Sequence, residues 1–246
     1  MDNHYMALIP AYAVATGIWF VSRRWLPQLW GLTREVTFKR PALEFSFAVL
    51  AGLAVLGVGQ LYLHDLLLPG SRHPLLEALN QFLIFSPVVL LLFLRRQSPA
   101  TVWLPADHIP YRLTAGVLLA LISLLTYAMI SREDPGPGPL VAEIMQVKHV
   151  PDLVQVFMED LTIALLLVRL SVWVGRQWAL VLVAVLFAAG HLPALIAQGS
   201  SWEETASLLL DTGIGVLVLS AVSASQDIWW FFIVHFVMDM TQFSGK

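Results

Sequence analysis

Two adjacent carboxylates, Glu159 and Asp160, interrupt an apolar run over residues 153–174. The run is long enough to cross a bilayer, and a charge well inside a membrane helix costs roughly 2.5–3.5 kcal/mol on insertion scales. Such residues usually face a polar interior and mark function. The pair is therefore the first candidate for chemistry in this chain.

Further ionisable residues occur in three later apolar runs. They are His191, Asp211, His235 and Asp239. If each run is a membrane helix that rises about 1.5 Å per residue and neighbouring runs alternate in direction, these residues lie at a depth close to that of Glu159. A single His or Asp in a span is as often a structural hydrogen bond between helices, so the functional hypothesis depends on the whole set.

Two pairs in these runs have a spacing of four residues. His235 and Asp239 share one helical face, and so do Phe187 and His191, with Phe187 expected to pack against His191 and fix it. Two imidazoles and four carboxylates in dry surroundings could hold and activate a water molecule. The predicted chemistry is therefore acid–base catalysis.

The composition indicates an integral membrane protein. Of 246 residues, 58% are hydrophobic and 13% charged, and the mean hydropathy is +0.74, which predicts one membrane domain over residues 1–246. The basic residues form no continuous stripe of the kind that binds nucleic acid. The absence of Cys excludes disulfides, thiolate metal sites and cysteine nucleophiles. The expected partners are the lipid bilayer and a membrane-associated peptide or protein.

Eight apolar segments are predicted to cross the bilayer, giving an all-α polytopic bundle of about eight transmembrane helices. They cover about residues 5–22, 43–67, 79–94, 113–130, 153–174, 178–198, 205–224 and 228–243. The Pro/Gly-rich segment 131–150 is predicted to be a linker between the first four spans and the four that carry charges.

The Lys and Arg residues predict an orientation. With eight spans, ten of the fourteen would lie on one side, so the positive-inside bias places both termini outside. Arg169 is one of the ten and is expected to snorkel to the interface.

Three short motifs carry a resemblance to a known family. Residues 159–160 (ED), 187–191 (FAAGH) and 235–239 (HFVMD) resemble, in this order, the motifs EExxxR, FxxxH and HxxxN or HxxxD of the CPBP intramembrane proteases, the Abi-type group that includes the CAAX prenyl endopeptidases. The resemblance covers roughly residues 152–243 and implies a catalytic core there.

The resemblance implies a role for each matching residue. Glu159 would activate a water molecule with His191 as its partner, and His235 with Asp239 would stabilise the oxyanion. Asp160 and Phe187, and Asp211 outside the motifs, are predicted to have supporting roles. The implied function is intramembrane endopeptidase activity on a membrane-associated peptide or protein.

The first motif departs from the family pattern at two positions. Its second acid is Asp160, and Ala164 stands where the family has an arginine. The resemblance implies that this arginine neutralises one of the acids, so here Asp160 must find another partner or be held protonated by burial.

Two alternatives stay open. His191, His235 and Glu159 could hold zinc, although the absence of an HExxH helix favours a metal-free site with no cofactor. The chain could also be a non-catalytic scaffold or a bacteriocin-immunity-type protein on the same fold, which the missing arginine favours. The compact, Cys-free chain suits a bacterial inner membrane.

Overall fold

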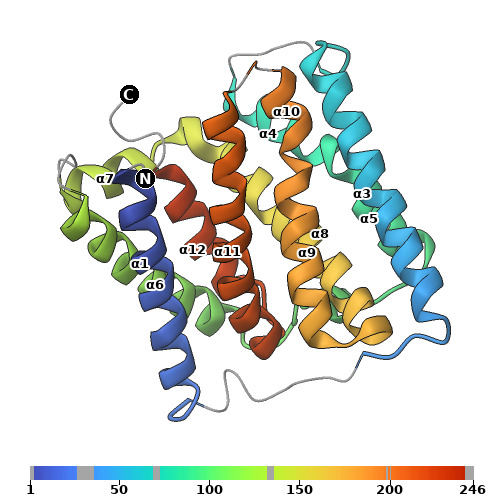
Figure 1. The fold of residues 1–246 in the computed structure, drawn as a ribbon, viewed down its shortest axis with the longest axis horizontal. Coiled ribbons are helices and arrows are strands. Elements are labelled where there is room, and N and C mark those ends of the chain that lie inside the picture. Colours follow the sequence, from blue (N-terminus) through green and yellow to red (C-terminus); the bar gives the residue numbers. More distant parts are fainter. Residues whose placement is uncertain are drawn as a thin grey trace.

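The computed structural model describes residues 3–26, 36–68, 73–131, 136–197, 199 and 201–241, and within these ranges it contains helices and loops but no strand (Figure 1). The longer helices are α1 (Asn3–Ser22), α3 (Pro41–Leu63), α6 (Ile109–Ile130), α8 (Val150–Val174), α9 (Arg176–Gly190), α11 (Trp202–Ser225) and α12 (Trp229–Met240). The shorter elements are α4 (Pro74–Ile84), α5 (Ser86–Leu94), α7 (Pro137–Ile144), α10 (Leu192–Ala197) and the 3₁₀ turns η1 (Pro99–Val102) and η2 (Val147–His149).

Each of the eight predicted spans contains a helix, so the all-α fold is confirmed. The number of crossings is confirmed only in part. Among the described residues, four helices are long and apolar enough to cross a membrane, or five if the bent pair α4 and α5 is one span. The helix α8 falls outside this set although it has 25 residues, and α9 and α12 have only 15 and 12.

The predicted third span, residues 79–94, is two helices instead of one. The axes of α4 and α5 differ by 51°, and the break lies at Phe85, immediately before Ser86 and Pro87. A proline lacks the N–H that would continue the helix and clashes with the preceding turn, so it fits best in a first turn and elsewhere bends or breaks the helix. Pro87 was therefore a sign of the bend in the sequence. Phe85, at the bend, lines the cavity described below.

The predicted linker, residues 131–150, is partly helical. It contains α7 and η2, while residues 132–135 lie outside the described part. Pro137 is in the first turn of α7, where a proline fits, and Gly136 precedes it with a φ of 97°. The Pro/Gly-rich composition therefore starts a short helix as well as separating two longer ones.

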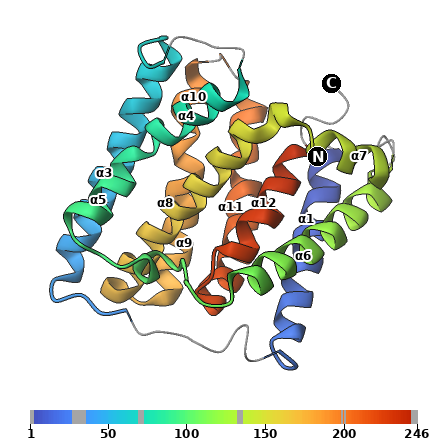
Figure 2. The ribbon, with the colours of Figure 1, turned by 180° about the vertical axis from the view of Figure 1, so that it is seen from behind.

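The helix α8 lies in the middle of the bundle (Figures 1 and 2). It packs against α3 and α4 on one side and against α9 and α12 on others. Neighbours on several sides leave little of α8 exposed, and the charged residues Asp160 and Arg169 are both buried. The central helix also carries two of the candidate site residues, Glu159 and Asp160.

The helix α12 is held closely against α6. A Cβ atom added to Gly116 of α6 would lie 2.8 Å from the backbone oxygen of Trp230, so any larger residue would force the two helices apart. The indole of Trp230 also stacks on Trp19 of α1, with ring centroids 5.8 Å apart. These contacts fix α12 and therefore the residues of the third motif.

A buried ion pair holds the start of α12. Arg112 donates from Nη1 to Oδ2 of Asp227 over 2.5 Å, and both side chains are buried. The other carboxylate oxygen of Asp227 accepts from the backbone N–H of Trp229 over 2.8 Å. The ion pair and this backbone bond connect α6 to the turn between α11 and α12.

The prediction that Arg169 snorkels to the interface is wrong, because its side chain is fully buried. Its guanidinium donates to the side-chain oxygen of Gln97, to the backbone oxygen of Leu165 over 3.0 Å and to that of Thr101 over 3.3 Å. It also lies over the ring of Phe38, 5.2 Å from the centroid. Arg169 therefore connects α8 to the loop that follows α5.

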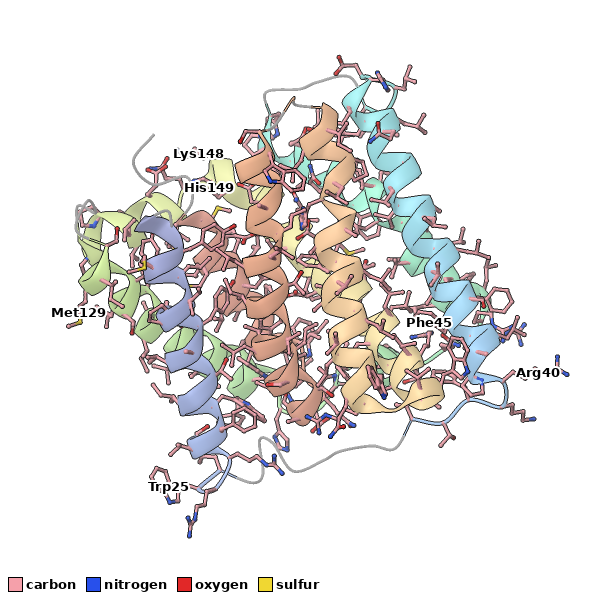
Figure 3. All side chains as sticks on the ribbon, in the orientation of Figure 1. Trp25, Arg40, Phe45, Met129, Lys148 and His149 are labelled. Carbon is pink, nitrogen blue, oxygen red and sulfur yellow. The ribbon has the colours of Figure 1, made fainter. Side chains whose placement is uncertain are left out.

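Basic residues gather at the end of the bundle where α1 and α5 end and where α3, α6 and α9 begin (Figures 1 and 3), and we call this the basic end. Its described members are Arg23, Arg24, Lys39, Arg40, Arg95, Arg96, Arg112 and Arg176. Ion pairs and ring contacts join the start of α3 to the ends of α5 and α8 there. Lys148 lies at the opposite end, which matches the separation predicted from the sequence for the described residues.

Candidate active site

Residues from three helices meet beside the middle of α8. Glu159 and Asp160 come from α8, His191 follows the last residue of α9, and His235 and Asp239 come from α12. Glu159, His235 and Asp239 each offer an oxygen or nitrogen atom, and these atoms lie within 4.8 Å of one another. The structure thus brings the first and third motifs into direct proximity.

The imidazole of His235 has an acid on each side. Its Nδ1 lies 2.9 Å from Oδ1 of Asp160, and its Nε2 lies 3.7 Å from Oδ1 of Asp239. The ring of Phe231 stacks on it, with centroids 5.4 Å apart and an interplanar angle of 17°. Asp160, which was expected only to support the site, is therefore the nearer partner of His235, and Asp239 is the more distant one.

This geometry shows which group partners Asp160 in place of the family's arginine. Ala164, at the family's arginine position, is buried one turn beyond Asp160, and the partner of Asp160 is His235. The second carboxylate oxygen of Asp160 is buried and has no hydrogen-bond partner among the described residues. The acid is thus held on one side only, by an imidazole from another helix.

Glu159 has a partner that the sequence reasoning missed. Gln155, one turn earlier on α8, donates from Nε2 to Oε1 of Glu159 over 2.9 Å. The spacing of four residues was a signal for this contact, because such pairs lie side by side on a helix. Gln155 holds one oxygen of Glu159 and leaves the other available.

His191 lies at the end of α9, where the helix stops and α10 begins. The ring of Phe187 meets it edge to face with centroids 4.9 Å apart, so the predicted packing contact is present. The same Phe187 ring lies 6.5 Å from that of His235. Phe187 is therefore an apolar neighbour of both imidazoles.

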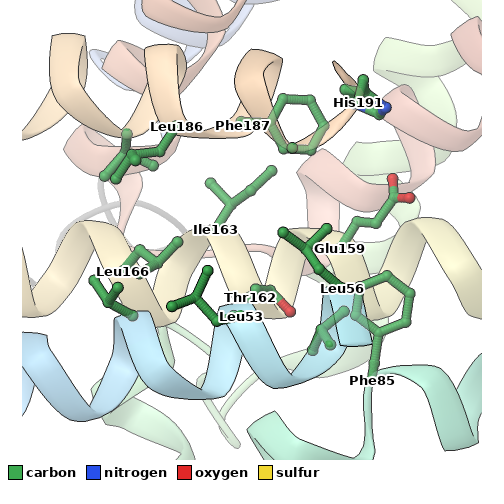
Figure 4. Close-up of a pocket in the computed structure, with 15 residues that line it drawn as sticks. Leu53, Leu56, Phe85, Glu159, Thr162, Ile163, Leu166, Leu186, Phe187 and His191 are labelled. Carbon is green, nitrogen blue, oxygen red and sulfur yellow. The ribbon is translucent and has the colours of Figure 1, made fainter. Parts of the chain in front are cut away.

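Glu159 and His191 line one cavity of about 260 Å³ between α3, α8 and α9. Figure 4 shows the carboxylate of Glu159 projecting from α8 toward the side of the cavity where Phe187 and His191 lie. The other walls are mainly apolar, with Leu53 and Leu56 from α3 and Phe85 from the bend. The cavity thus has a polar end, which contains Glu159 and His191, and an apolar remainder.

The set of residues that could hold a metal differs from the predicted one. Among the described residues it consists of Glu159, His235 and Asp239, whereas the sequence suggested His191 with His235 and Glu159. Asp211 is on α11, but its side chain lies outside the described part of the structure.

The arrangement can do acid–base chemistry on a bound carbonyl group. It offers a carboxylate with one oxygen available, an imidazole oriented by an acid, and a second imidazole on the wall of the same cavity. Such groups can take a proton from water and donate hydrogen bonds to a developing oxyanion.

Comparison with known proteins identifies the segment that carries these residues. Residues 152–241 match the family model described as Type II CAAX prenyl endopeptidase Rce1-like. No curated protein and no solved structure matches the chain. The matched segment runs through all three motifs, from the first turn of α8 to the end of α12. The family model thus confirms the resemblance seen in the motifs, and residues 152–241 are similar to the CAAX prenyl endopeptidase-like family.

Proposed function

We propose that this protein is an intramembrane endopeptidase that hydrolyses a peptide bond of a membrane-associated peptide or protein with a water molecule activated by Glu159. The observation that carries the proposal is the meeting of Glu159, His235 and Asp239 within 4.8 Å beside an apolar cavity, inside the segment that matches the family. We also propose that the eight predicted segments cross a bacterial inner membrane.

In the proposed reaction Glu159 takes a proton from water, and the oxygen of that water attacks the carbonyl carbon of the peptide bond. The attack forms a C–O bond and a tetrahedral oxyanion, and the C–N bond then breaks as the proton passes from Glu159 to the leaving amine. The products are a new carboxyl end and a new amine. Gln155 would hold one oxygen of Glu159 so that the other faces the water.

His235 would donate a hydrogen bond from Nε2 to the oxyanion, with a proton on each ring nitrogen. Asp160 accepts from Nδ1 in this arrangement and fixes the plane of the ring, which the stacked ring of Phe231 also supports. A donor placed where negative charge develops typically contributes a factor of about 100 to 1,000 to the rate. Asp239, whose Oδ1 lies 3.7 Å from Nε2 and beyond hydrogen-bond distance, would stabilise the positive charge of this doubly protonated ring and leave its Nε2–H to the oxyanion.

His191 would bind the attacking water together with Glu159, since both line the same cavity. Its edge contact with Phe187 would restrict the rotation of the ring. The apolar walls would receive the substrate segment next to the cleaved bond and exclude bulk water, which strengthens the electrostatic interactions inside the site.

A divalent metal is the variant of this mechanism. Glu159, His235 and Asp239 would hold it, and the metal would polarise the attacking water. We propose the metal-free form. Prolonged chelation should then leave activity intact, whereas loss of activity on chelation and its recovery with zinc would establish the metal form.

A non-catalytic scaffold is the competing function, and the missing arginine favoured it. The contact between Asp160 and His235 supports an enzyme, because the second acid keeps a defined partner without the arginine. Incubation of the purified protein with a library of apolar peptides, followed by mass spectrometry, tests the proposal. New termini that require Glu159 are expected, and intact peptides with both the native protein and the Glu159→Gln variant would favour the scaffold.

A further inference from the structure

A second cavity, of about 460 Å³, lies between α5, η1 and α8. It shares no lining residue with the cavity at Glu159. Leu161 is its contribution from α8, and at 100° per residue this position points about 200° away from Glu159. The second cavity is therefore on the opposite face of the central helix and has no place in the proposed reaction.

The lining is apolar except at Arg96 and Gln97, which come just after the end of α5. The amide of Gln97 is occupied, because its nitrogen donates to Glu44 and its oxygen accepts from Arg169. Arg95 pairs with Glu44 as well. Arg96 is exposed and forms no ion pair with any residue in the described ranges. It is the available positive charge at this cavity.

The cavity reaches inward from Arg96. Leu161 precedes Arg169 by eight residues, which is about 12 Å along α8, and the guanidinium of Arg169 contacts Gln97. A distance of 12 Å is most of one leaflet of a hydrocarbon core about 30 Å thick. An apolar cavity of about 150 Å³ takes up benzene, so one of 460 Å³ has room for the larger part of an acyl chain.

We propose that this cavity binds an anionic phospholipid, with one acyl chain between α5, η1 and α8 and the phosphate at Arg96. Arg96 lies at the basic end, and basic residues at the membrane surface attract anionic headgroups. The acyl chain would pack against Leu161, beside Asp160, and so support the helix that carries the site.

Native mass spectrometry of the delipidated protein with added phosphatidylglycerol or phosphatidylcholine tests the proposal. The native protein should retain one phosphatidylglycerol at least five times more strongly than phosphatidylcholine, and only the first should raise its melting temperature. The Arg96→Gln variant should lose this preference. The matched control Arg40→Gln, which changes an exposed cation at the same end but outside the lining, should keep it.

Two further measurements separate the chain from the headgroup. Inorganic phosphate at the same concentration should leave the melting temperature unchanged. A phosphatidylglycerol with a photoreactive group in its acyl chain should crosslink the native protein at Leu92 or Leu161, both of which line the cavity. Equal loss of preference in both variants, stabilisation by inorganic phosphate, or crosslinks confined to other helices would overturn the proposal.

Discussion

The close contact between α6 and α12 predicts the effect of a single methyl group at Gly116. A Cβ atom there would lie 2.8 Å from the backbone oxygen and 2.9 Å from the Cα of Trp230. Backbone atoms cannot rotate away as a side chain can, so α6 and α12 must separate by about 0.6 Å to restore an ordinary contact of 3.4 Å. Overpacking of this kind costs about 1–3 kcal/mol.

The same substitution should raise stability at a glycine where an added Cβ atom meets no other atom. Gly57 on α3 has no atom within 4 Å of an added Cβ, and Ala is preferred over Gly in a helix by roughly 0.5–1 kcal/mol. The Gly57→Ala variant is therefore the matched control. At about 2–4 °C per kcal/mol for a chain of this length, the two variants should melt several degrees apart.

The methyl group should also reduce activity, because α12 carries His235 five residues after Trp230. A displacement of about 1 Å in a catalytic group can cost a factor of 100, so we expect Gly116→Ala to lower kcat about tenfold. Thermal melts in detergent and peptide-cleavage rates measure both effects. A Gly116→Ala protein that melts with or above Gly57→Ala would refute the tight packing of α6 on α12.

Three further predictions concern Asp160, Arg169 and the orientation in the membrane. Asp160→Asn should melt above Asp160→Ala, because Asn keeps an oxygen for Nδ1 of His235 and an unpaired buried group costs about 1–3 kcal/mol; the reverse order would contradict the hydrogen bond. Arg169→Met should lower the free energy of unfolding by about 1–3 kcal/mol, because it leaves Gln97 without its donor. The control Arg24→Met, at an exposed arginine, should change it by no more than about 0.5 kcal/mol, and equal melting temperatures would argue against a buried Arg169. The positive-inside bias predicts that the basic end faces the cytoplasm. In intact cells, an impermeant maleimide should therefore label Met145→Cys and spare Ser98→Cys, with no background because the native chain has no Cys; labelling of Ser98→Cys alone would invert the orientation.

The sequence predicted the helices and the motif residues because both depend on local patterns. Apolar runs located the spans, and spacings of four residues placed His235 beside Asp239 and Phe187 beside His191. The bend at Phe85 also had a local signal in Ser86 and Pro87, which the prediction of one continuous span overlooked.

The contacts between distant segments could not be predicted in the same way. The pairing of Asp160 with His235 joins positions 75 residues apart and depends on how α8 and α12 are rotated about their axes. Arg169 is buried because Gln97, 72 residues earlier, lies beside it, and apolar periodicity carries no information on such a pairing. The predicted metal ligands differ from those in the structure for the same reason. The sequence suggested His191 with Glu159 and His235, whereas in the structure it is Asp239 that lies near these two.

The central claim is that Glu159 activates the water that cleaves the peptide, and a ratio of cleavage rates tests it directly. Glu159→Gln keeps the size of the side chain and can still meet Gln155, but it cannot accept a proton. The matched control is Glu143→Gln, which changes a carboxylate on α7 that pairs with Lys148 at the opposite end from the basic residues. The account predicts that Glu159→Gln lowers the rate by a factor of about 100 or more while Glu143→Gln stays near the native rate. A Glu159→Gln protein that cleaves at the native rate would contradict it.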